Sequence, residues 1–145
     1  MVNKVNPLTI GGLAKATGVH VETIRYYERE GILPPAERTA ANYRMYSPAA
    51  VARLRFVLRA KTLGFSLAEI RNLLALQAGG DRGAVRALAQ AHLQDIEARI
   101  QDLLAMRAVL ATAVADCDGH GAVDGCPIID AIQTRPASTD HTDGV

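Results

Sequence analysis

Cysteine, aromatic residues and long apolar runs are scarce in this sequence of 145 residues. Two cysteines cannot build the multi-bridge framework of a small secreted domain, and they cannot supply the four thiolates of an iron–sulfur cluster from one chain. The longest leucine- and alanine-rich stretch, residues 103–115, contains Arg107 and is shorter than the ~20 apolar residues of a membrane-spanning helix. Residues 1–7 carry a single lysine and resemble no secretory signal or transit peptide. We therefore expect a cytoplasmic protein without a membrane segment.

Catalytic motifs are also missing, while charge is distributed unevenly. The sequence contains no HExxH, P-loop or GxSxG motif, so we do not expect an enzyme. The net charge is only +1, but residues 1–75 hold 11 Lys and Arg against 5 Asp and Glu, whereas residues 76–145 hold 5 against 10. A basic front half beside an acidic back half favours a polyanionic partner such as nucleic acid.

The first half has the pattern of a helix-turn-helix. Helical periodicity dominates the chain, and its few β-branched residues do not alternate over a long run, so we expect a mainly α-helical fold with little strand. A first helix follows Thr9 as N-cap and stops near Gly18, and a second covers residues 21–30 and ends at Gly31. Two short helices joined by a glycine-containing turn are typical of a motif whose second helix enters the DNA major groove.

A wing and two more helices are expected next. Pro34 and Pro35 exclude a helix, and the residues at 43–46 suit a short strand, which predicts a small β-ribbon or wing. Ser47 followed by Pro48 then begins a third helix, and Ser66, with Glu69 three residues later, begins a fourth. A polar linker with three glycines is predicted at 77–83.

A long helix is predicted at 84–116. Apolar residues recur on one face at coiled-coil spacing, broken once by Arg107. About thirty helical residues span about 45 Å, too long for the small front half to cover. We expect a homodimer, and the alternative is one helix packed back on its own domain.

Two cysteines follow the long helix and form a candidate metal site. Cys117 and Cys126 are separated by eight residues in a loop rich in glycine and acidic residues, so both sulfurs can meet one ion. Thiolates select soft metals, here Cu(I), Ag(I), Hg(II), Zn(II), Cd(II) or Pb(II). His120 is a candidate third ligand, which would favour zinc-like ions. The alternatives are a structural cysteine pair or a redox disulfide. The loop with a short terminal helix occupies 117–132, and a disordered tail is predicted at 133–145.

Four motifs in order resemble the MerR family of metal-responsive transcription regulators. These are LTIGGLAK at 8–15, VETIRYYEREG at 21–31, NYRMY at 42–46 and LGFSLAEI at 63–70. The resemblance implies a winged-helix DNA-binding domain at 8–76, an antiparallel dimerisation coiled coil and a metal-binding loop at its end. It also implies RNA polymerase as a partner and activation of a metal efflux or detoxification promoter by distortion of the operator DNA.

The resemblance implies a set of DNA contacts. Arg25 and Tyr26 would face base edges and phosphates from the second helix, and Tyr43 and Arg44 would hold the DNA backbone from the wing. The remaining candidates are Thr23, Arg38 and Lys61.

The sequence does not decide which metal ion binds. Divalent sensors of the family usually have a third cysteine at the start of the long helix, and copper sensors have a serine, whereas this chain has Arg82. Eight residues between the cysteines match the mercury-type spacing, since copper-type loops are commonly one residue shorter. Two thiolates beside Arg82 would suit Cu(I), whereas a site with His120 would suit zinc-like ions. A thiol–disulfide regulator and a non-regulatory metal-binding protein remain alternatives.

Overall fold

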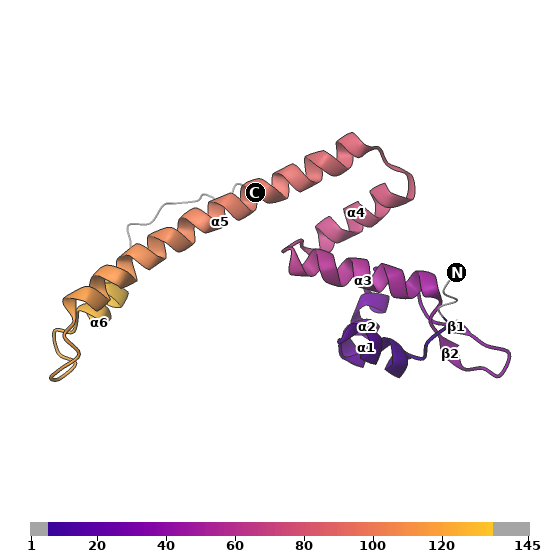
Figure 1. Cartoon of the computed structure of the whole chain (residues 1–145), viewed down its shortest axis with the longest axis horizontal. Coiled ribbons are helices and arrows are strands. Elements are labelled where there is room, and N and C mark those ends of the chain that lie inside the picture. The colour runs from indigo at the N-terminus through magenta and orange to yellow at the C-terminus, as the bar shows by residue number, and fades with distance from the viewer. Residues whose placement is uncertain (1–5, 135–145) are drawn as a thin grey trace. The chain divides into compact units, whose positions relative to one another are not determined.

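The structure is a computed structural model that describes residues 6–134 and is mainly helical, with one two-stranded ribbon within that range (Figure 1). The chain divides into two compact units, residues 1–89 and 90–145. None of the described helices is both long and apolar enough to cross a membrane. The elements in chain order are α1 (Ile10–Thr17), α2 (Val21–Arg29), β1 (Glu37–Arg38), β2 (Arg44–Met45), α3 (Pro48–Thr62), α4 (Leu67–Gly79), α5 (Arg82–Asp116) and α6 (Pro127–Gln133).

Helices α1 and α2 form the predicted helix-turn-helix. The Thr9 hydroxyl caps α1 by accepting a hydrogen bond from the Gly12 amide at 3.1 Å. Gly18 then takes the left-handed conformation, with φ 73°, and its amide bonds to the Ala14 carbonyl. After α2, the chain reverses at Gly31. Both helix boundaries therefore confirm the sequence prediction to within a residue.

The wing is an antiparallel ribbon of β1 and β2 in which Glu37 pairs with Met45 and Arg38 pairs with Arg44. The second strand continues into a bridge between Leu8 and Tyr46, whose backbones exchange hydrogen bonds of 3.0 and 2.7 Å. This bridge ties the wing to the segment just before α1.

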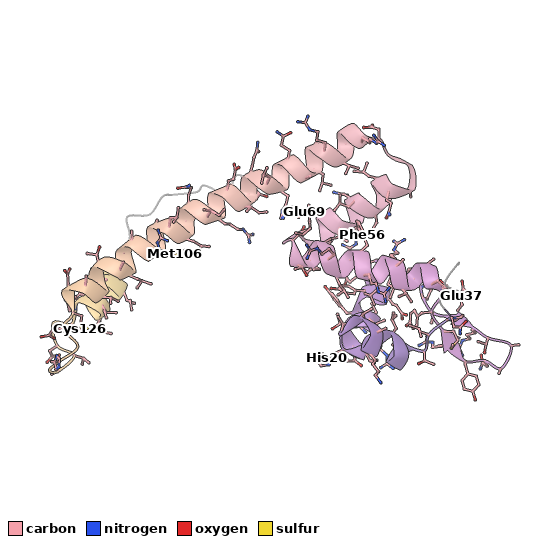
Figure 2. All side chains as sticks on the ribbon, in the orientation of Figure 1. His20, Glu37, Phe56, Glu69, Met106 and Cys126 are labelled. Atoms are coloured by element: carbon pink, nitrogen blue, oxygen red, sulfur yellow. The ribbon has the colours of Figure 1, made fainter. Side chains whose placement is uncertain are left out.

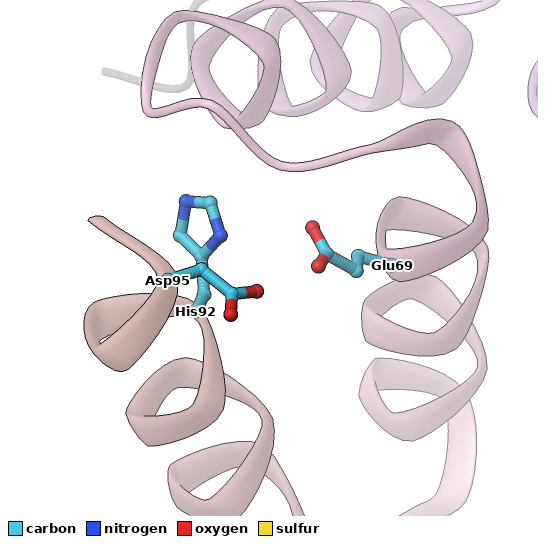
Figure 3. A group of neighbouring side chains, drawn as sticks. All are labelled: Glu69, His92 and Asp95. Carbon is cyan, nitrogen blue, oxygen red and sulfur yellow. The ribbon is translucent and has the colours of Figure 1, made fainter. Parts of the chain in front are cut away.

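Helices α3 and α4 complete the first unit. Ser47 caps α3, and Pro48 occupies its first turn. Ser66 and Glu69 form a reciprocal capping box at α4, where Figure 3 shows the Glu69 side chain projecting from the first turn. The core of this unit is a single apolar cluster that includes Leu13, Ile24, Tyr27, Ile32, Leu33, Tyr46, Val51, Leu54, Val57, Ile70 and Leu74.

The expected linker at 77–83 is largely helical. Helix α4 continues to Gly79 and α5 begins at Arg82, so only Gly80 and Asp81 lie between the two helices. The Asp81 carboxylate accepts a hydrogen bond from the Ala84 amide at 2.9 Å, which caps the start of α5. Glycine content alone does not indicate this cap.

The second unit contains most of α5, a loop and the short helix α6, which packs beside the last turns of α5 (Figure 1). Much of the apolar surface of α5 is exposed, including Leu93, Ile100, Leu103, Leu110 and Val114 of the predicted seam. Helix α6 extends to Gln133, one residue beyond the predicted boundary. Thr134 follows as the C-cap of α6, and residues 135–145 of the predicted tail lie outside the described residues.

Candidate functional site

The second helix of the helix-turn-helix presents a polar surface. Helix α2 buries Ile24 and Tyr27 in the core, which leaves Arg25 and Tyr26 exposed and Thr23 partly exposed. The Arg25 guanidinium pairs with Glu22 one turn earlier at 3.1 Å, and both side chains are largely exposed. An exposed pair of this kind contributes little to stability, so Arg25 is available to an anionic partner.

The wing places further cationic and aromatic groups in solvent. Tyr43 is 69% exposed near the tip of the ribbon. Asn42 at that tip has φ 66°, and its side-chain oxygen accepts a hydrogen bond from Arg38 at 3.0 Å. Arg38 and Arg44 lie directly opposite each other in the ladder. Like charges at this position destabilise a ribbon, and a bound polyanion would offset that repulsion.

A buried tyrosine connects the wing to α2. Tyr46, which is 2% exposed, donates a hydrogen bond from its hydroxyl to the Glu28 carboxylate of α2. Burial and the bond to Glu28 raise the pKa of Tyr46, while the charges of Arg44 and Arg25 act in the opposite direction. Because Tyr46 directly follows β2 and Glu28 lies on α2, this hydrogen bond joins the wing to the second helix of the helix-turn-helix.

Sequence reasoning missed the Glu28–Tyr46 pair. Both residues stand in the quoted motifs, but they are 18 positions apart and no local period connects them. Lys61 lies exposed in the last turn of α3, on a different element from α2 and the wing.

The second candidate site is the loop between α5 and α6, which carries Cys126 at the start of α6 (Figure 2). Cys117 and Cys126 are free, partly exposed thiols. The thiol of Cys117 acts on that of Cys126 and lowers its pKa, which places the two sulfur groups near each other. Residues 116–127 line one open hollow of about 480 Å³. The structure therefore brings together the two cysteines that the sequence singled out.

The thiol of Cys126 is activated by its position before α6. Hydrogen bonds from the backbone amides of Ile129 and Ile128 have the largest effects and lower its pKa, which burial raises in part; the nearby Cys117 lowers it slightly and Asp130 raises it slightly. A lowered pKa increases the thiolate fraction, and the thiolate is the form that binds metal. Thiolates are the donors that soft metal ions prefer.

His120 lies in the same loop but does not meet both sulfurs in the structure. Its ring nitrogen Nδ1 donates to the Asp118 carbonyl at 2.8 Å, and its amide donates to the Asp118 carboxylate at 3.0 Å. Within residues 6–134, the two sulfurs and a ring nitrogen of His120 do not all lie within 4.8 Å of one another.

These features define a DNA-binding regulator of the winged helix-turn-helix class, and comparison with known proteins identifies its family. A model of the MerR helix-turn-helix regulatory proteins matches residues 8–77, and a model of the MerR DNA-binding region matches residues 51–113. The chain belongs to the MerR family of metal-responsive transcriptional regulators, and it is not an enzyme.

Sequence relatives cover nearly the whole chain. The mercuric resistance operon regulatory protein of Pseudomonas fluorescens is 42% identical over 133 residues, which is 92% of each protein. The transcriptional regulator HmrR of Sinorhizobium medicae is 41% identical over 125 residues, covering 85% of this chain and 84% of the relative.

Solved structures of metal-bound regulators are also similar. A transcription regulator from Ralstonia metallidurans in complex with lead(II) matches with a TM-score of 0.72 and 32% identity, over 86% of this chain and 98% of the other. The dual-function regulator MerR from Bacillus megaterium, in complex with a mercury(II) ion, matches with a TM-score of 0.65 and 33% identity over the same shares. The chain is thus similar, over most of its length, to regulators crystallised with soft divalent metals.

Proposed function

We propose that this chain is a homodimeric transcription activator that senses a soft metal ion through Cys117 and Cys126. The observation that carries the proposal is that these two free thiols line one hollow in the loop at the end of α5. A soft cation bound there would bridge two thiolates and compensate their mutual repulsion. The proposal agrees with the metals bound by the regulators from Ralstonia metallidurans and Bacillus megaterium.

Operator DNA would bind to the surface formed by α2 and the wing. Arg25 and Tyr26 would contact base edges and phosphates, with Thr23 at the edge of the same helix. Tyr43, Arg44 and Arg38 would contact the backbone from the wing, and Lys61 would add a further phosphate contact. Exposure of these side chains, and the repulsion between Arg38 and Arg44 in the ribbon, support this assignment.

The dimer would form through α5. Leu103 is 62% exposed on this helix, and four other apolar residues of the same seam are exposed with it. A face of this kind is stable in water when a second helix covers it. The resemblance to the family favours an antiparallel pair of α5 helices from two copies of the chain.

Activation would work through the shape of the DNA. Metal held by Cys117 and Cys126 would favour one arrangement of the two DNA-binding domains over another, as any effector must in order to shift an equilibrium. The favoured arrangement would bend and untwist the operator, so that RNA polymerase in the cytoplasm meets both promoter elements on one face. The regulated promoter would serve metal efflux or detoxification.

The test separates metal sensing from DNA binding. Cys117→Ser and Cys126→Ser should each abolish metal-dependent transcription in vitro, while operator affinity stays within about twofold of the parent, since the cysteines lie outside the DNA-binding unit. Promoter opening and operator binding are measured on the same reduced samples. Activation by an oxidant such as hydrogen peroxide in the absence of metal would instead support a thiol–disulfide switch. Metal binding without an operator footprint would support a non-regulatory metal protein.

A further inference from the structure

The hollow in the loop between α5 and α6 has too few cysteines for a metal site of three thiolates. The chain contains two cysteines in all, and both line the hollow formed by residues 116–127. A third ligand from this loop must therefore be nitrogen or oxygen. His120 supplies the one imidazole among these residues, and Asp116, Asp118 and Asp124 supply carboxylates.

The charge of the hollow favours a divalent over a monovalent ion. Two thiolates carry two negative charges, and the three aspartates add more, whereas residues 116–127 include no lysine or arginine. A monovalent ion would leave the thiolate pair with a net negative charge among these carboxylates. A divalent ion neutralises the pair, and the charge of a bound ion dominates the local electrostatics of such a site.

His120 is held in the tautomer that a metal ligand requires. The Asp118 carbonyl oxygen can only accept a hydrogen bond, so the 2.8 Å contact needs a proton on Nδ1. The lone pair is then left on Nε2. A hydrogen bond from the second ring nitrogen to a carbonyl is the usual way in which proteins orient a metal-bound imidazole.

The loop allows His120 to approach the sulfurs. The imidazole and both sulfurs do not all lie within 4.8 Å of one another in the structure, so coordination requires the ring to move. Gly119 and Gly121 flank His120 with φ 75° and 91°. Glycine has the widest choice of backbone conformations at such positions, and a Cβ built at either residue meets nothing within 4 Å.

We infer that His120, through Nε2, is the third ligand of a divalent cation held by Cys117 and Cys126. The inference rests on the proposed function, because it takes the two cysteines as metal ligands. It assigns to the loop of a single chain a donor set of two sulfurs and one nitrogen, which suits ions of the zinc and cadmium class.

The test follows the imidazole directly. Reduced, full-length protein labelled with ¹⁵N-histidine is titrated with Zn(II) and with Cd(II), and the ring nitrogens are observed by NMR. One Nε2 resonance should move on metal binding, and this change should disappear in His120→Gln but persist in His20→Gln. His20 is an exposed histidine whose side chain makes no capping bond at α2, which makes it a matched control.

Affinity provides the second readout. The dissociation constant for Zn(II) should rise about tenfold or more in His120→Gln, while Hg(II), which two thiolates satisfy, should bind unchanged. Equal Zn(II) affinity in His120→Gln and the parent, or no imidazole shift, would overturn the inference. So would a parent protein that binds Cu(I) or Hg(II) but neither Zn(II) nor Cd(II).

Failure of the inference can be told apart from failure of the proposed function. If Cys117→Ser and Cys126→Ser lose every metal while His120→Gln behaves like the parent, only the role of His120 is wrong. If the two serine variants keep the metal affinity of the parent, the proposed thiolate site is wrong, and the inference about His120 falls with it.

Discussion

The two compact units of this chain differ in how far they bury their apolar side chains. The unit of residues 1–89 closes a core in which Leu13, Ile24, Leu54, Val57 and Ile70 are all fully buried. In the described part of the other unit, Ala113 is the one buried apolar residue. Its long helix instead exposes leucine, isoleucine, valine and methionine side chains, among them Met106 (Figure 2). The first unit buries its apolar residues within a single chain. The second unit instead exposes the apolar face of α5, which suits packing against a partner helix.

The largest expected effect is loss of the dimer. Leu103→Asp places a charge in the proposed seam once in each copy, and burying a charge without a partner costs several kcal/mol. The dimer dissociation constant should rise about a thousandfold, or about 4 kcal/mol, as measured by analytical ultracentrifugation. Gln101→Asp adds the same charge outside the seam and should leave the dimer intact. An unchanged dimer in Leu103→Asp would show that α5 is covered in another way.

A core truncation should affect the first unit alone. Leu54 of α3 is fully buried, and Leu54→Ala should lower the free energy of unfolding by about 3 kcal/mol through lost apolar contacts and a cavity. Urea denaturation followed by circular dichroism measures this change. Leu103→Ala is the matched truncation, and in samples dilute enough to be monomeric it should cost less than about 1 kcal/mol. Similar losses in both variants would contradict the contrast between the units.

A smaller effect is expected at the wing. Arg44→Ala should weaken operator binding about tenfold, or about 1.4 kcal/mol, and should reduce the salt slope of binding by about one. Fluorescence anisotropy at several salt concentrations measures both quantities. Metal affinity should be unaffected, because Arg44 belongs to the other unit. An unchanged salt slope would exclude a phosphate contact at Arg44.

The smallest effect should come from the link between the wing and α2. Tyr46→Phe keeps the buried ring but removes the hydrogen bond to Glu28, which should cost about 1 kcal/mol of folding stability. Operator affinity should also fall, because Arg25 and Arg44 on the linked elements would be less well positioned. A double-mutant cycle with Glu28→Gln checks the coupling. Additive effects of the two substitutions would mean that the bond does not position the DNA-binding surface.

Local features of the first unit could be predicted because each depends on neighbouring residues. Thr9, Ser47 and Ser66 cap the helices that they precede, and Gly18 ends α1, as their side-chain chemistry requires. The linker at 77–83 was predicted less well. Glycine content suggested a break, but the Asp81 carboxylate stabilises the first turn of α5, which leaves two residues between the helices.

In the candidate sites, too, the sequence predicts the residue types, whereas the contacts between them depend on the tertiary structure. Cys117 and Cys126 can be selected from the sequence because they are the two cysteines of the chain and only eight residues separate them. That they line one hollow, and that the amides of Ile129 and Ile128 lower the pKa of Cys126, depends on how α6 begins. The sequence marks His120 as a candidate ligand, but the hydrogen bond that orients its ring depends on the loop conformation.

The sequence alone determined the order of helices and wing, the family and the identity of the two thiols, because caps, apolar periods and cysteine spacing act over a few residues. Only the tertiary structure decided that Tyr46 reaches Glu28, that Arg38 opposes Arg44, and that the two cysteines share one hollow. The residues in these contacts are separated in the sequence by distances that no helical or strand period relates. They form because packing of the core, pairing of the ribbon and closure of the loop bring distant parts of the chain together.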